Sequence, residues 1–374
     1  MTRAALERLS WTAAGLTVLL LTGCTAPQQQ ARLEATQRWN ETRARVKARL
    51  AADQFEAGNI AAAAKELAEA RRLTPEDTGV LPLQARVLLA EGQTAQAEQL
   101  LMSAKSAGLA SAEVEYLLGV VRQQQQRWED ARTLFLRAAE LDGTQVDYVL
   151  AAAQAYLQLD QAPAALEFLE GQVARFGWTD AYQAALAECY EQLGQPMAAA
   201  AAWERVLGAS AADGVVRARL AEALYRSKRY DQAAEVLQGL LRDGVAEIPE
   251  RLARLMLGEC HLAAGRPAAA REQAQQVLIG CPDDAVALRL LARALGSANE
   301  HAAAFRIARR ALSVNGDDPR NLELTAGLAW RTGATDEAES CARRLLALAP
   351  QHPLARHILG SVGTAGEPSP DARR

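Results

Sequence analysis

Apolar residues recur at spacings of three and four along most of the chain, which is typical of amphipathic α-helices. The pattern itself returns every 34 residues, starting from the segment 50–75. We number nine repeats, whose first positions are Ala44, Thr78, Ala112, Val146, Asp180, Gly214, Arg251, Ala285 and Pro319. A three-residue insertion, Ile248-Pro249-Glu250, interrupts the series before repeat 7. We therefore expect each half of a repeat to be one amphipathic helix.

Two columns of small residues indicate where the paired helices approach each other. Position 8 is small in all nine repeats: Ala51, Ala85, Gly119, Ala153, Ala187, Ala221, Gly258, Ala292 and Ala326. Position 20 is alanine throughout: Ala63, Ala97, Ala131, Ala165, Ala199, Ala233, Ala270, Ala304 and Ala338. Position 24 is larger in repeats 1 to 6 (Leu67, Leu101, Phe135, Leu169, Trp203 and Leu237) and alanine in the last three (Ala274, Ala308 and Ala342). We predict close antiparallel pairs that must stack on their neighbours, because one pair cannot bury its apolar face alone.

The helix ends are also marked in the sequence. Glycine falls near position 15 in five repeats, at Gly58, Gly92, Gly194, Gly265 and Gly333, where a left-handed residue would close the first helix. Pro163, Pro196 and Pro267 fall at position 17 or 18, in the first turn expected for the second helix, where proline is tolerated.

Composition agrees with a helical chain and narrows its chemistry. Half of the residues are hydrophobic but only 5% are aromatic, which disfavours sheets. The formal net charge is −4 and no basic stripe occurs, so we expect no nucleic-acid partner. The cysteines beyond residue 24 are Cys189, Cys260, Cys281 and Cys341, with no CxxC motif. We expect buried free thiols at Cys189 and Cys260, and leave open whether any of the four forms a disulfide.

The period and its small-residue columns resemble the tetratricopeptide repeat over residues 44–352. The resemblance implies an all-α fold, a right-handed α-solenoid of about nine helix-turn-helix repeats. Position 4 departs from the family, because its usual aromatic is replaced by Lys47, Leu81, Glu115, Val149, Gln183, Arg217, Arg254, Leu288 and Leu322. The small-residue columns hold throughout, so the resemblance stands.

In this family, positions 2, 5, 9, 12 and 13 of the first helix line a concave groove and meet ligands. The resemblance therefore implies a partner-binding groove formed by Arg86, Gln123, Gln154, Glu188, Glu191, Glu222, Tyr225, Glu259, Arg289, Arg293 and Trp330. Further polar groove positions are Tyr116, Gln124, Gln158, Gln192, Arg226, Arg320, Glu323 and Arg331. The family's clamp of Lys, Asn and Arg on a terminal carboxylate is not reproduced. The alternative is that these residues form only a solvated face.

One row of the groove carries like charge. Glu188, Glu222 and Glu259 share position 9 of repeats 5 to 7, and Glu191 adds to them from position 12. The charge changes sign at Arg289 and Arg293 in repeat 8. This acidic row is either incidental or suited to a partner with basic residues.

The two ends of the chain differ from the repeats. We divide the chain into a signal peptide at 1–23, a short tether and helix at 24–43, the repeats at 44–352, a capping helix at 353–362 and a disordered tail at 363–374. The helix within 24–43 would cap or extend repeat 1, with Trp39 packing inward.

The first 24 residues have the layout of a secretory signal, with Arg3 and Arg8 before an uncharged apolar run too short to cross a bilayer. The junction LTGC at 21–24 resembles the lipobox of bacterial lipoproteins. The resemblance implies cleavage between Gly23 and Cys24 and a diacylglycerol on the sulfur of Cys24. An ordinary secretory cleavage and a chance cysteine are the alternatives. Thr25 in place of an aspartate favours the periplasmic face of the outer membrane.

No catalytic constellation is indicated by the sequence. It has no phosphate-binding glycine loop, and the histidines His261, His301, His352 and His357 are poorly spaced for a metal. We expect no enzyme, cofactor or metal, but a lipid-anchored scaffold that binds proteins or extended peptides in the bacterial cell envelope. The alternative is a module that binds glycan or small ligands in envelope polysaccharide synthesis or export.

Overall fold

The computed structural model describes residues 25–209, 213–244 and 248–365. The predicted signal peptide, Cys24 and residues 366–374 lie outside these ranges. The described residues form two compact bodies, which are divided between Gln161 and Ala162 and which we treat separately. Within the described residues, no helix combines the length and hydrophobicity needed to cross a membrane.

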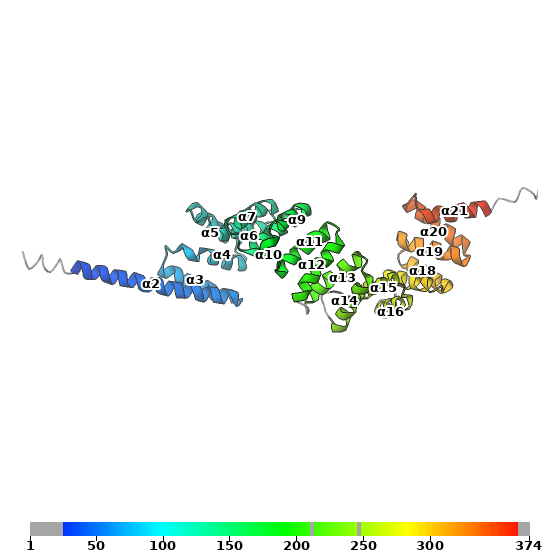
Figure 1. The fold of residues 1–374 in the computed structure, drawn as a ribbon, viewed down its shortest axis with the longest axis horizontal. Coiled ribbons are helices and arrows are strands. Elements are labelled where there is room, and N and C mark those ends of the chain that lie inside the picture. The colour runs from blue at the N-terminus through cyan, green and yellow to red at the C-terminus, as the bar shows by residue number, and fades with distance from the viewer. Residues whose placement is uncertain (1–24, 210–212, 245–247, 366–374) are drawn as a thin grey trace, which may run out of the picture. The chain divides into compact units, whose positions relative to one another are not determined.

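The described part of the N-terminal body is helical (Figure 1). Its elements are α2 (Thr25–Glu56), α3 (Ile60–Leu73), the 3₁₀ turn η1 (Thr78–Val80), α4 (Leu81–Ala90), α5 (Thr94–Ser106), α6 (Ala112–Gln124), α7 (Trp128–Leu141) and α8 (Val146–Gln158). The C-terminal body continues the series in its described residues. It contains α9 (Ala162–Glu170), α10 (Val173–Phe176), α11 (Asp180–Gln192), α12 (Pro196–Ala209), α13 (Gly214–Arg226), α14 (Tyr230–Asp243), α15 (Glu250–Ala263), α16 (Pro267–Gly280), α17 (Ala285–Ser297), α18 (His301–Val314), α19 (Pro319–Thr332), α20 (Thr335–Leu348) and α21 (Pro353–Ala365).

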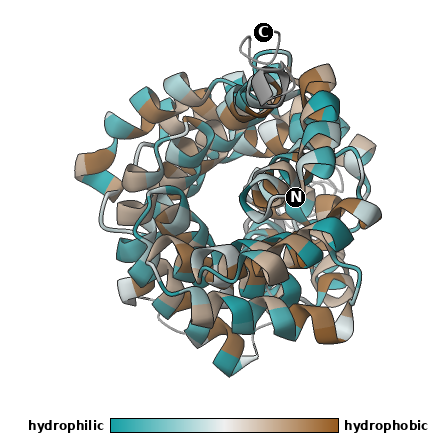
Figure 2. Ribbon diagram, turned by 90° about the vertical axis from the view of Figure 1, so that its right-hand side faces the viewer, coloured by the Kyte–Doolittle hydropathy of each residue, from teal (hydrophilic) through white to brown (hydrophobic). Residues whose placement is uncertain are grey.

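The small-residue columns lie where the sequence predicts. All nine alanines at position 20 have no exposed surface, and every residue at positions 8 and 24 is buried. Buried clusters cross the repeat boundaries, and one of them joins Ala187 to Cys260 through three repeats. Hydrophobic and hydrophilic segments accordingly alternate along the helices (Figure 2). The prediction of close helical pairs that stack on one another is confirmed.

The turn at position 15 is more uniform in the structure than in the sequence. The five predicted glycines have positive φ values, from 64° at Gly194 to 79° at Gly58 and Gly333. The other four repeats place Gln126, Asp160, Lys228 and Asn299 in the same left-handed region, with φ between 55° and 65°. The backbone of the turn is thus the same in all nine repeats, whichever residue occupies it.

A column of helix caps at position 34 was not recognised in the sequence. Asp213, Asp284 and Asp318 each precede the first helix of the next repeat and accept hydrogen bonds from its first backbone N–H groups. Ser111 does the same for α6. These side chains satisfy donors that a helix start otherwise leaves unpaired.

Three local expectations need correction. Helix α2 is continuous from residue 25 into repeat 1, and Trp39 is 62% exposed on it, five residues before Ala44, the first buried residue among those described. Helix α21 includes residues 363–365, which we expected to belong to the tail. The second helix of repeat 4 is broken between α9 and α10. The hydroxyl of Tyr182 donates to the Leu169 carbonyl at that break, which satisfies a freed acceptor.

Candidate partner-binding groove

Equivalent positions of neighbouring first helices lie next to each other in the C-terminal body. Arg293 and Glu259 occupy position 9 of repeats 8 and 7, 34 residues apart. Nη1 of Arg293 donates to both carboxylate oxygens of Glu259, at 2.5 and 2.6 Å. Side chains at a given groove position therefore form rows across the stacked repeats.

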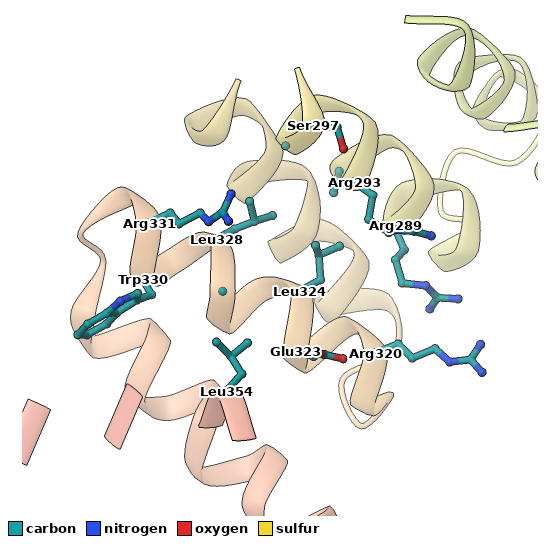
Figure 3. A pocket seen from close by; sticks show the side chains of 13 residues that line it. Arg289, Arg293, Ser297, Arg320, Glu323, Leu324, Leu328, Trp330, Arg331 and Leu354 are labelled. Carbon is teal, nitrogen blue, oxygen red and sulfur yellow. The ribbon is translucent and has the colours of Figure 1, made fainter. Parts of the chain in front are cut away.

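Repeats 8 and 9 form a pocket of about 670 Å³ at these positions (Figure 3). Its polar lining comes from Arg289, Arg293, Ser297, Arg320, Glu323 and Arg331. Leu324, Leu328, Leu354 and Trp330 supply its apolar part, and Gly296 and Gly327 leave space between them. The predicted groove residues Arg289, Arg293 and Trp330 are thus brought together in one cavity.

The arginines of this pocket have different electrostatic surroundings. Arg289 donates from Nη1 to Asp318 at 2.8 Å and to Asn321 at 3.0 Å, while Arg293 is held by Glu259. Arg320 and Arg331 are exposed, and within the described chain their guanidinium groups form no ion pair. Among the described residues that line the pocket, Glu323 carries the one carboxylate, whose Oε1 lies 3.7 Å from Nε2 of His352.

The predicted acidic row is largely neutralised by arginines. Glu191 accepts from Nε1 of Trp203 at 2.7 Å and lies 3.3 Å from Arg219. Glu222 pairs with Arg226, one turn further along α13, and Glu259 pairs with Arg293. The four carboxylates are thus not a row of unopposed negative charge, because three of them pair with arginines.

Glu188 is the member of the row that makes no hydrogen bond or ion pair with the rest of the described chain. It is half-buried, and this burial raises the pKa of its carboxyl group. Arg219 opposes the shift and Glu191 reinforces it. The acidic end of the groove thus keeps one carboxylate that a ligand group could pair with.

Two smaller hollows continue the groove in repeats 5 to 7. The first, of about 140 Å³, is lined by Glu191, Glu222 and Arg226 with small residues between them. The second, of about 550 Å³, has Tyr225 and Glu222 on one side and the inserted Ile248 and Pro249 on another. The insertion before repeat 7 therefore adds apolar surface to the groove.

The predicted groove residues of the N-terminal body make contacts within that body. The guanidinium carbon of Arg86 sits 4.7 Å from the ring centre of Phe55, a cation–π contact between repeats 2 and 1. Gln123 and Gln154 are half-buried on α6 and α8. The ring of Tyr116 packs against that of Tyr148, with 4.9 Å between the ring centres.

Some groove residues were missed in the sequence. Leu354 lines the pocket from position 2 of the incomplete tenth repeat, so the same column rule would have found it. Arg219, at position 6, compensates the acidic row but lies outside the positions considered. Gly296 and Gly327 occupy positions 12 and 9 and contribute space rather than a side chain.

The described residues show little further chemistry. No group of three or more His, Cys, Asp or Glu among them could hold a metal ion. Cys189 and Cys260 are buried free thiols, and burial raises the pKa of each to about 12. Cys281 is exposed and Cys341 is buried, both as free thiols.

Comparison with known proteins supports the repeat assignment. A family model for the tetratricopeptide repeat matches residues 184–244 and 218–285. No curated protein sequence matches the chain. Among solved structures, the C-terminal part of a TPR repeat-containing protein from Cytophaga hutchinsonii aligns with a TM-score of 0.50 and 13% identity, covering 65% of this chain and 99% of that one.

Two other solved structures align less closely. A Pseudomonas aeruginosa pilF structure has a TM-score of 0.44 and 21% identity, covering 57% of this chain and 96% of that one. A tetratricopeptide repeat protein from Parabacteroides merdae has a TM-score of 0.44 and 12% identity, covering 68% and 99%.

The repeat match supports a protein-interaction scaffold and indicates no enzyme family. The helical pairs, the buried columns, the family-model match within residues 184–285 and the fold shared with the Cytophaga structure together identify the chain as an all-α solenoid of tetratricopeptide repeats.

Proposed function

We propose that this protein is a lipid-anchored scaffold of the bacterial cell envelope, which holds other proteins or extended peptides in the groove of its repeats. The observation that carries the binding role is the pocket of repeats 8 and 9. Its lining comes mainly from groove positions 2, 5, 9, 12 and 13, and it combines apolar surface with unpaired positive charge. Such a mixture suits a polypeptide, whose side chains are both apolar and charged.

The proposal of an anchor rests on the sequence around Cys24. A lipid there would place the repeats at a membrane surface, since two or three acyl chains make attachment effectively permanent. We expect Cys24→Ala to release the protein from washed membranes or to leave it uncleaved. A variant that is processed normally and stays membrane-bound would overturn the lipoprotein part of the proposal.

The binding role is tested by site-specific photo-crosslinking in intact envelopes. A photoreactive residue at Ser297, in the pocket, should crosslink to one or a few proteins. The same group at Arg306, exposed on the second helix α18 and not in the pocket lining, is the matched control. Equal crosslinking patterns from both positions would show that the groove is not the binding surface.

The aromatic content of the groove bears on the glycan alternative. Trp330 is the one aromatic side chain among the described residues that line the pocket of repeats 8 and 9. Its ring and the imidazole of His357 are arranged edge-to-face, with 6.4 Å between ring centres. Sugar recognition relies on stacked aromatic faces, so this pocket favours a peptide.

A further inference from the structure

The pocket of repeats 8 and 9 has an apolar middle and charged ends. Figure 3 shows Arg289 and Arg320 reaching toward one end and Trp330 at the other, with leucines between them. Gly327 lies on α19 at the pocket, where an added Cβ would meet Leu354 Cδ2 at 3.5 Å, an ordinary contact distance. A larger side chain at 327 would therefore occupy space that is now open to a ligand.

Two of the described side chains that line the pocket carry positive charge without an internal partner. Arg289 and Arg293 are compensated by Asp318 and Glu259, so they contribute little net charge to a ligand. Arg320 and Arg331 remain exposed, without an ion pair to the described residues. An anionic ligand would gain most from these two guanidinium groups, because no internal carboxylate has to be displaced.

The spacing of these two arginines defines a ligand length. They are eleven residues apart on α19, which is three helical turns, so they project from the same side of the helix about 16 Å apart along its axis. An extended peptide advances about 3.3 Å per residue. Two acidic residues about five positions apart would therefore reach both arginines.

The residues between the arginines define what lies in the middle of the ligand. Leu324 and Leu328 lie on α19 between Arg320 and Arg331, and Leu354 approaches from α21. Glu323 also lies between them, so a third acidic residue at the centre of the ligand would be repelled. Large aliphatic side chains suit this middle.

We propose that the pocket binds an extended peptide segment in which two acidic residues, about five positions apart, flank aliphatic residues. The inference rests on the proposed protein-binding role and gives the chemistry of the partner at this site. The two acidic side chains lie within the peptide segment and not at a chain terminus, because one arginine pairs with each end of the segment.

The test uses the purified full chain and a fluorescein-labelled peptide with blocked termini, Gly-Glu-Ala-Leu-Leu-Ala-Glu-Gly, followed by fluorescence anisotropy. We expect this peptide to bind at least tenfold more tightly than the same peptide with lysines for both glutamates. It should also bind more tightly than an isomer with the two glutamates adjacent. The double variant Arg320→Glu/Arg331→Glu should lose at least tenfold in affinity.

Two further variants separate site-specific binding from general charge effects. Arg242→Glu/Arg306→Glu changes the net charge equally at exposed arginines outside the pocket, and its affinity should stay within twofold of the wild type. Gly327→Leu leaves the charge unchanged but fills the middle, and should weaken binding with an unaltered circular dichroism spectrum.

Three results would overturn the inference: equal affinity for the acidic and lysine peptides, no dependence on the glutamate spacing, or equal losses in both double variants. Competition by phosphatidylglycerol vesicles as strong as by unlabelled peptide would also overturn it, in favour of an anionic lipid. If Ser297 crosslinks to partner proteins while the acidic peptide fails to bind, the inference fails but the proposed function stands. If Ser297 crosslinks to no partner protein and the acidic peptide does not bind, the inference and the proposed function both fail.

Discussion

The contact between Gly119 and Phe135 gives the sharpest test of how the repeats pack. Gly119 occupies the small position 8 of repeat 3, and Phe135 occupies position 24, where repeats 1, 2, 4 and 6 have leucine. A Cβ atom on Gly119 would lie 2.5 Å from Cε1 and 2.6 Å from Cδ1 of the Phe135 ring. Carbon atoms in contact prefer about 3.5–4.0 Å. The ring is fully buried, with Tyr116 packed against it, so it has little room to move.

The effect of Gly119→Ala on the free energy of unfolding should therefore change sign with the residue at position 135. Overpacking costs about 1–3 kcal/mol, while alanine is about 1 kcal/mol better than glycine inside a helix. In the wild type we expect a net loss of up to about 2 kcal/mol. In a Phe135→Leu background the clash is absent and the helical gain should remain, because the pair then matches four other repeats. The coupling free energy between the two sites should be about 1–3 kcal/mol.

Urea denaturation of the four proteins, followed by circular dichroism, measures this cycle. The unfolding of a repeat protein need not be two-state, so the comparison is made on the transition that reports repeat 3. Gly296→Ala is the control, because its Cβ would meet Leu328 at an ordinary 3.6 Å and the change should stabilise. Equal effects of Gly119→Ala in both backgrounds would refute the steric explanation.

Three further predictions follow from the turns, the thiols and the helix caps. Lys228→Gly should raise stability by about 0.5–1 kcal/mol, since a left-handed lysine carries strain that glycine relieves; a thermal melt showing a loss would contradict this. A disulfide reagent at pH 8 should label Cys281 in the folded chain, while Cys189 and Cys260, with pKa values raised to about 12 by burial, should react only in denaturant. Burial raises the pKa of the Asp284 carboxyl, but the Arg251 guanidinium and two backbone N–H groups together lower it below its usual value. Asp284→Asn should therefore cost about 1 kcal/mol at neutral pH, and the difference should fade as pH falls below about 4, through the lowered pKa; a pH-independent difference would exclude the charge as its cause.

Much of the fold could be predicted because each repeat samples the same environment again. One alanine says little about burial, but alanine at position 20 in nine repeats indicates a contact that admits no larger side chain. The left-handed turn was only half visible, because glycine reveals it and Lys228 or Gln126 does not. In those repeats the stacked helices impose the conformation, and nothing local in the sequence reports it.

The groove positions could be predicted from the sequence, but the ion pairs that compensate their charges could not. Glu222 and Glu259 lie at the predicted position, yet their compensation by Arg226 and Arg293 depends on side-chain contacts within and across repeats. Trp39 was misplaced for a related reason. Its apolar side chain suggested a partner surface, but α2 begins well before the helix that packs against it.

The start of α2, which is exposed from Gln29 to Trp39, gives the repeats a defined reach. From Thr25 to Ala44, the first buried residue among those whose burial is described, the helix rises about 28 Å, at about 1.5 Å per residue. For a chain held by a lipid on Cys24, this segment is a rod nearly as long as the hydrocarbon core of a bilayer is thick, about 30 Å. A rod fixes the distance between its two ends, which a flexible tether does not. Partners would then be bound beyond the lipid headgroups. Removing whole turns from this helical segment would bring the binding groove toward the membrane in steps of about 5.4 Å.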